Sequence, residues 1–128
     1  MKIVNLIVRL LLGLVFVVFG LNGFLHFIPM PPPTGTAAQF LGAMFVSHYL
    51  VAVFLLQLIP GVLLLINRFV PLALTLLGPV IVNILLFHIS MNPAGLPLPL
   101  VVTVFWLVTA WSVRSAFAGI FQQNVPEE

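Results

Sequence analysis

The chain has 128 residues, of which 62% are hydrophobic and only 5% are charged, and its mean hydropathy is +1.32. A soluble domain carries about a quarter charged residues, so this chain has too little polar surface to fold as a globule in water. The bilayer is the expected solvent, and the length suits one compact domain over residues 1–128. The six ionic side chains form no basic cluster, which excludes nucleic-acid binding.

Cysteine is absent, and no Asp or Glu precedes position 127. The first absence excludes disulfides, thiol redox pairs, cysteine nucleophiles and cysteine-ligated iron–sulfur clusters. The second leaves histidine as the main candidate for acid–base work. Stand-alone catalysis is therefore not favoured, and whether the protein is an enzyme stays open at this point.

Four segments approach the roughly 20 apolar residues that a spanning helix needs. They cover residues 4–27, 48–66, 69–89 and 98–117. Because lipid leaves the backbone to satisfy its own hydrogen bonds, we expect an all-α fold, an integral membrane four-helix bundle. We expect the first segment to be a retained span, because its apolar run exceeds the roughly 7–15 residues of a cleaved signal peptide.

Glycines and prolines occur within these spans. Gly13 and Gly20 lie seven positions apart on one face of the first span, so we expect another helix to pack closely there. Pro60 and Pro79 interrupt the second and third spans, where kinks could open a cavity. Gln57 lies near the middle of the second span, where an amide can either bond to a neighbouring helix or contact a ligand.

The loop after the first span contains four prolines, which forbid helix: Pro29, Pro31, Pro32 and Pro33. The sequence Thr36-Ala37-Ala38-Gln39 then matches the capping-box pattern. We expect a short interfacial helix over residues 36–46 that breaks near Ser47 and His48 and covers the outer end of the bundle. The alternative is a single long, tilted second span.

All four cations fall on one side of the membrane if the chain crosses it four times: Lys2, Arg9, Arg68 and Arg114. The positive-inside rule then places both termini in the cytoplasm, as in a multi-pass protein of the cell inner membrane. Arg9 lies inside the first span, where it can either snorkel to that surface or form a buried anion site.

The same topology brings five polar residues to the outer third of the bundle: Asn22, His26, His48, Asn83 and His88. Imidazole can ligate a metal, bond a quinone carbonyl or move a proton, and ionisable groups in membrane spans suggest a functional site. Histidines near span ends can also lie harmlessly among headgroups and water. A metal site is disfavoured, because no carboxylate and no short His–His spacing is present.

The residues also resemble those of the DoxX family of small membrane proteins. The first span contains RLLLGL at residues 9–14 and FGLNGFLHF at residues 19–27, followed by the proline cluster. Later segments contain PGVLLL at residues 60–65, RFVPLA at 68–73, VNI at 82–84 and PAG at 93–95. The resemblance covers nearly the whole chain and implies a four-helix membrane bundle. Family members often carry Glu where this chain has Gln57, so proton-coupled chemistry is not carried over.

Some DoxX-like proteins are linked to sulfur-compound oxidation with quinone as acceptor, or to redox-stress complexes. The resemblance thus implies a redox-associated component, and we expect a quinone-like or lipidic molecule at the outer end. The five outer residues, with Gln57, would bind its polar head, while Phe24, Phe27 and Phe87 could wall the site. The alternative is a non-enzymatic assembly factor that holds a membrane protein partner or a second copy. Transport is disfavoured, because no inverted repeat and no midplane charge is seen.

Overall fold

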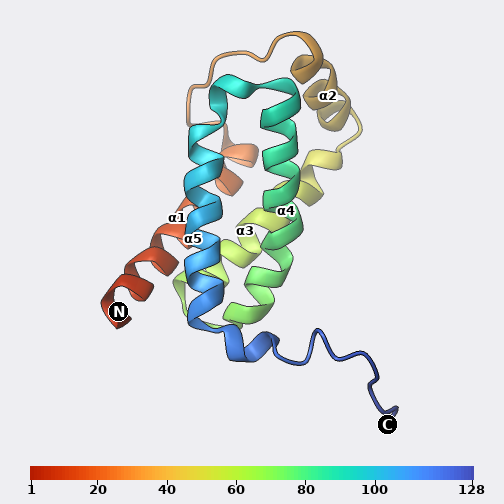
Figure 1. Ribbon diagram of the computed structural model, residues 1–128. Coiled ribbons are helices and arrows are strands. Elements are labelled where there is room, and N and C mark those ends of the chain that lie inside the picture. Colours follow the sequence, from red (N-terminus) through yellow and green to blue (C-terminus); the bar gives the residue numbers. More distant parts are fainter.

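The computed structural model describes all 128 residues, and all of its regular elements are helices. The α-helices are α1 (Lys2–Leu25), α2 (Gly35–Val46), α3 (Tyr49–Leu65), α4 (Val70–Met91) and α5 (Pro97–Ser112). Two short 3₁₀ turns, η1 (Pro93–Gly95) and η2 (Arg114–Phe117), follow α4 and α5 (Figure 1). The all-α class expected from the sequence is confirmed.

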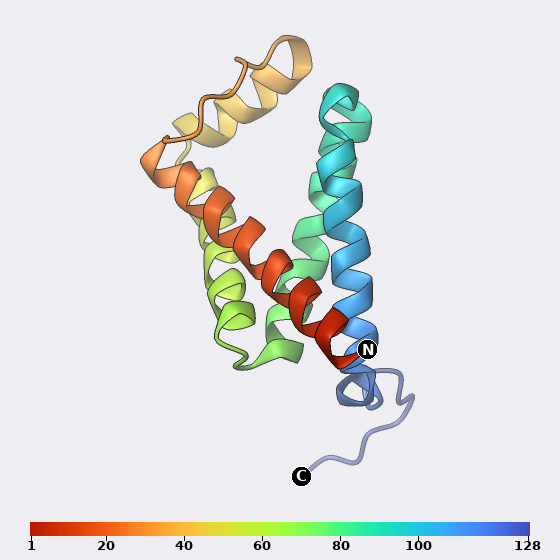
Figure 2. The ribbon, with the colours of Figure 1, turned by 90° about the vertical axis from the view of Figure 1, so that its left-hand side faces the viewer.

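Four of the helices pack as a ring in which α1 contacts α3 and α5, and α4 contacts the same two. The short helix α2 lies across one end of this ring and contacts α3 and α4 (Figure 2). We call that end the α2 end; it also holds the carboxyl end of α1 and the turn η1. The opposite end, which we call the basic end, holds the start of α1, the α3–α4 turn and η2 (Figure 1).

Two helices, α1 and α4, are long and apolar enough to cross a membrane, with mean hydropathies of 2.5 and 2.3 over their best windows. The bent pair α2 and α3 makes a third if it counts as one span. The expected fourth span over residues 98–117 is shorter than predicted, because α5 has 16 residues and the chain continues as a 3₁₀ turn. Such a helix is about 24 Å long, less than the roughly 30 Å of hydrocarbon.

The short helix before the second span and the break after it are confirmed. Helices α2 and α3 meet at 90°, with Ser47 and His48 between them, which rules out one long second span. The predicted capping box is wrong, because the helix begins earlier. Thr34 is its N-cap residue and Gly35, at φ 59°, turns the chain into the first helical residues. No side chain caps this helix by a hydrogen bond.

The closest helix packing joins α1 to α3, as the glycines predicted. A Cβ built on Gly13 would lie 2.9 Å from the carbonyl oxygen of Gly61, so the two backbones are nearly in contact. Gly20 is equally close to Leu58. Arg9 reaches across the same interface, where its Nη1 donates a hydrogen bond to the carbonyl oxygen of Leu64 in the last turn of α3. Arg9 therefore ties two helices together instead of only extending to the surface.

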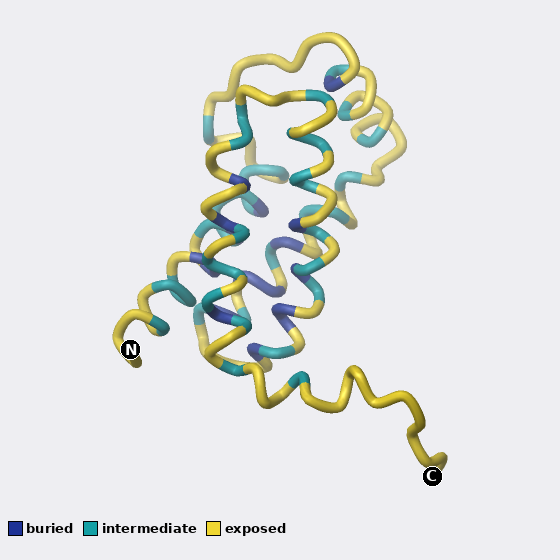
Figure 3. The backbone as a smooth tube through the Cα atoms, in the orientation of Figure 1, coloured by how far each residue is buried: buried dark blue, intermediate teal, exposed yellow.

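The buried core fills the half of the bundle nearest the basic end. Leu12, Leu64, Leu74 and Leu77 are all fully buried there. Trp106 fixes α5 to α4, since its Nε1 donates to the carbonyl oxygen of Leu74 at 2.9 Å. Many other large apolar side chains are exposed, and Figure 3 shows most of the buried residues inside the bundle, with Ala37 of α2 buried as well. An apolar exterior around a small core is what a lipid-facing bundle requires.

Candidate functional site

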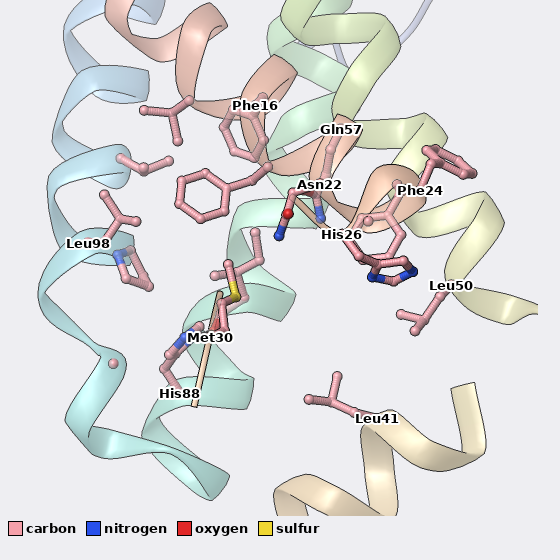
Figure 4. A pocket seen from close by; sticks show the side chains of 18 of the residues that line it. Phe16, Asn22, Phe24, His26, Met30, Leu41, Leu50, Gln57, His88 and Leu98 are labelled. Atoms are coloured by element: carbon pink, nitrogen blue, oxygen red, sulfur yellow. Dashed lines mark hydrogen bonds between the residues drawn. The ribbon is translucent and has the colours of Figure 1, made fainter. Parts of the chain in front are cut away.

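The half of the bundle nearest the α2 end is hollow. A cavity of about 580 Å³, which we call the central cavity, lies between α1, α3, α4 and α5, and Leu41 and Phe45 of α2 cover it. Its walls are mostly apolar. Five of the six predicted site residues line it: Asn22, His26, His48, Gln57 and His88 (Figure 4). Helices distant in sequence thus bring these side chains to one space.

Asn22 and His26 lie at the end of α1, but they are held differently. The Asn22 side chain accepts a hydrogen bond from the backbone N–H of Ile28 at 2.7 Å, which ties the chain after the helix back to its last turn. His26 is the C-cap residue, with a left-handed φ of 53°, and its side chain is exposed at the cavity edge. Histidine is one of the few non-glycine residues enriched in that conformation.

His48 occupies a similar position at the bend. It is the N-cap residue of α3, it has a left-handed φ of 63°, and it is exposed. Two of the three predicted histidines are therefore hinge residues whose backbone conformation redirects the chain. Both histidines therefore have a conformational role in the backbone, in addition to their place on the cavity wall.

His88 differs, because it lies within α4 and is half-buried. Its Nδ1 lies 2.7 Å from the carbonyl oxygen of Ile84, and its ring stands edge-on to Phe87 at 5.1 Å between centroids. On its other edge, a Cβ built on Gly95 would lie 3.2 Å from Nε2. Among the three imidazoles, His88 is the one whose ring makes a hydrogen bond within the protein.

Gln57 lies at the inner limit of the central cavity and is only 8% exposed. None of the side-chain hydrogen bonds between helices involves it; those bonds belong to Arg9 and Trp106. Its amide instead borders two cavities at once. The ligand-contact interpretation is therefore favoured over that of a bond to a neighbouring helix.

Asn83 does not join the other five residues. It borders a second hollow of about 1030 Å³ between α2, α3 and α4, which we call the side cavity, and it is absent from the central one. Its Nδ2 donates to the carbonyl oxygen of Pro79 at 2.8 Å. Asn83 and His88 are five positions apart, about 140° around a helix, so they face different directions. The expectation that all five outer residues converge is corrected on this point.

The side cavity and the central cavity share part of their lining. Six residues border both: Leu41, Leu50, Phe54, Gln57, Ile84 and His88. Exposed residues of α3 and α4, among them Leu56 and Leu86, form its outer rim. Pro60 and Pro79 lack the N–H that would bond the carbonyls of Leu56 and Thr75, and these two residues line the side cavity.

Of the three predicted aromatic wall residues, Phe24 lines the central cavity, Phe87 lines the side cavity and Phe27 lines neither. Sequence reasoning missed Phe54, whose ring stands edge-on to Phe24 at 6.0 Å between centroids. Phe16, Phe19 and Met30 were missed too. The signal available for Phe54 was its position three residues before Gln57, on the adjoining part of the same helix face.

The chemistry of this site is that of neutral hydrogen bonding inside apolar walls. No three His, Cys, Asp or Glu side chains cluster closely enough to hold a metal ion. Both Glu residues are in the tail, and no carboxylate lines either cavity. The central cavity can therefore orient and desolvate a polar head, and imidazole is the one kind of titratable side chain in its wall.

Comparison of the chain with family models, curated proteins and solved structures gave no match. The resemblance to the DoxX family stays a prediction from the sequence.

Proposed function

We propose that this protein is a four-helix inner-membrane protein that binds a quinone-like or lipidic small molecule at its α2 end, as a component associated with redox chemistry. The observation that carries the proposal is the central cavity of about 580 Å³, which lies within an apolar bundle and gathers five polar side chains. Ligand sites typically have about 300–1,000 Å³ and mostly apolar walls with a few convergent polar groups.

The packing of α1, α3, α4 and α5 as a ring supports four crossings. Helices α3 and α5, with 17 and 16 residues, need local thinning of the bilayer or snorkelling flanks to cross it. Lys2, Arg68 and Arg114 all lie at the basic end (Figure 1), which the positive-inside rule assigns to the cytoplasm. The DoxX resemblance favours the same bundle and a quinone-linked role.

The two cavities fit an amphiphilic molecule. A polar head in the central cavity would contact Asn22, Gln57 and His88, with His26 and His48 at the edge. An apolar tail would leave through the side cavity, between the exposed sides of α3 and α4. A ligand of this kind dissolves in the bilayer, so it can reach the site without crossing water.

Equilibrium binding of a decyl-substituted benzoquinone to the purified protein in lipid nanodiscs tests the proposal. The wild type should bind it saturably with one site per chain, and Asn22→Ala with His88→Ala should weaken binding about tenfold or more, because both groups face the head. Thr103→Ala is the matched control, since Thr103 lines neither cavity and its hydroxyl donates to the carbonyl oxygen of Pro99 within the same helix. Equal affinity in the wild type and the double variant would contradict the proposal.

A second candidate function is a membrane assembly factor without chemistry. The observation that favours it is α2, in which only Ala37 is buried and Phe45 and Val46 are 64% and 77% exposed. Such a helix could hold a partner protein at the membrane surface. Affinity purification in mild detergent separates the two functions, because a stoichiometric partner without a copurifying small molecule supports the second.

A further inference from the structure

The hydrogen bond of His88 determines which of its ring nitrogens carries the proton. Nδ1 lies 2.7 Å from the carbonyl oxygen of Ile84. A carbonyl oxygen can only accept a hydrogen bond, so Nδ1 must be the protonated nitrogen. In the neutral imidazole the other nitrogen, Nε2, then has a lone pair and no proton, and it can only accept.

Nε2 makes no hydrogen bond within the protein. Gly95 packs against the Nε2 edge of the ring, and a Cβ there would lie 2.9 Å from Cδ2 and 3.2 Å from Nε2. The only hydrogen bond of the His88 ring is the one that Nδ1 makes with Ile84. His88, labelled in Figure 4, and Gly95 both border the central cavity. The cavity wall thus presents one hydrogen-bond acceptor of fixed identity.

Asn22 provides the complementary group. The backbone N–H of Ile28 can only donate, so the Asn22 atom that it meets at 2.7 Å is the carbonyl oxygen of the amide. The amide Nδ2 is then left as a donor on a residue that lines the same cavity. A fixed acceptor on α4 and a fixed donor on α1 therefore border one space.

We propose that the central cavity selects the hydroquinone form of its ligand over the quinone form. This inference rests on the proposed function. A hydroquinone hydroxyl donates its proton to a hydrogen bond with Nε2 of His88, while a hydroxyl oxygen accepts one from Asn22. A quinone has carbonyl oxygens only, so it cannot donate a hydrogen bond to Nε2. A carbonyl oxygen near Nε2 would instead place its lone pair against the lone pair of that nitrogen.

The test compares three probes on the full-length protein in nanodiscs by calorimetry: a decyl hydroquinone, its quinone and its dimethyl ether. Titrations are anaerobic and at about pH 8, where imidazole is ordinarily neutral. The hydroquinone should bind about tenfold or more tightly than either of the others, because only it can donate. Dodecanol, a hydroxyl without a ring, should bind more weakly than the hydroquinone, since Phe24 and Phe54 offer aromatic walls.

Two substitutions of His88 form a matched pair. His88→Asn keeps an amide N–H near the position of Nδ1 but has no atom at Nε2, so it should remove the preference for the hydroquinone. His88→Gln reaches the Nε2 position with an amide oxygen, so it should retain part of the preference. Gly95→Ala tests the same edge without replacing the imidazole, because its Cβ would crowd Cδ2 and Nε2 of His88. It should weaken hydroquinone binding more than quinone binding.

The possible failures are distinct. Equal affinities for the hydroquinone, the quinone and the ether, unchanged in His88→Asn, would overturn the selectivity and leave the proposed function standing. Dodecanol binding as tightly as the hydroquinone would assign the site to hydroxyl-bearing lipids and overturn the choice of a hydroquinone. Absence of saturable binding for all probes would overturn both the selectivity and the proposed function.

Discussion

Residue identity at the α2 end reflects backbone conformation as much as chemistry. Four non-glycine residues have a left-handed φ: His26, His48, Asn67 and Phe69. Each lies where a helix ends or the next begins. Asn and His tolerate this region better than most residues, so a histidine at a bend is partly a conformational choice. His88, in a regular helix and bonded to Ile84, has no such explanation.

Substitutions at His48 separate the two roles. His48→Gly keeps the left-handed turn at no steric cost, so its thermal stability in detergent should equal or exceed that of the wild type. His48→Val should lose about 1–2 kcal/mol, because a β-branched side chain is disfavoured at this φ. A glycine variant that unfolds at a lower temperature than the valine variant would contradict this account. If the glycine variant also binds quinone normally, the imidazole is not a ligand contact.

At the scale of elements, the pairing of α1 with α3 organises the bundle. Gly13 and Gly61 let the two backbones nearly touch, and Arg9 adds a hydrogen bond from α1 to the end of α3. Toward the α2 end, Gly23 lies against the ring of Phe54. The pair therefore forms one wall of the central cavity, while α4 and α5 form the other (Figure 2). Tight packing on one side of the ring coexists with a hollow beside it.

Alanine substitutions test this packing. Gly13→Ala and Gly61→Ala place a Cβ 2.9–3.0 Å from a backbone oxygen of the other helix. We expect a net loss of about 1–2 kcal/mol, since overpacking outweighs the gain in helix propensity. Gly78→Ala is the control, because its Cβ would meet only Trp106, at 3.6 Å. It should raise the unfolding temperature, whereas equal effects at all three positions would argue against a close α1–α3 contact.

For the whole molecule, both cavities lie at the end opposite the cationic residues. The basic end contains Lys2, Arg68 and Arg114, and the α2 end contains no Lys or Arg. Under the proposed four-span topology, the ligand site therefore opens on the non-cytoplasmic side. This polarity is a property of the entire chain, since the residues that establish it come from every helix.

Labelling of single cysteines checks this topology, and the natural chain has no cysteine to interfere. Thr34→Cys and Ala94→Cys should react with a membrane-impermeant maleimide in intact cells. Ile66→Cys and Ser115→Cys should react only after permeabilisation, because they lie at the basic end. All four positions are exposed, so access depends on the membrane alone. Labelling of Ile66→Cys in intact cells would contradict four crossings.

Much of this fold could be predicted, because apolar runs specify helices in lipid and charge specifies their alternation. The break at Ser47 and His48 was predictable too, since one helix from Thr36 to Ile66 would be about 46 Å long and would exceed the roughly 30 Å of hydrocarbon. The side-chain directions were not. Asn83 and His88 were grouped by depth, although their angular separation in α4 sends them to different cavities. The sequence indicates how deep a residue lies along a span more directly than it indicates which neighbouring helix that residue faces.

The solid packing of Leu12, Leu64, Leu74 and Leu77 has a bioenergetic consequence. These four fully buried apolar side chains lie between the cavities and the basic end. Under the proposed function, protons released when a bound hydroquinone is oxidised, or taken up when a bound quinone is reduced, would equilibrate with the compartment at the α2 end. Turnover coupled to an electron donor on that same side would be electroneutral, and it would add nothing to the membrane potential.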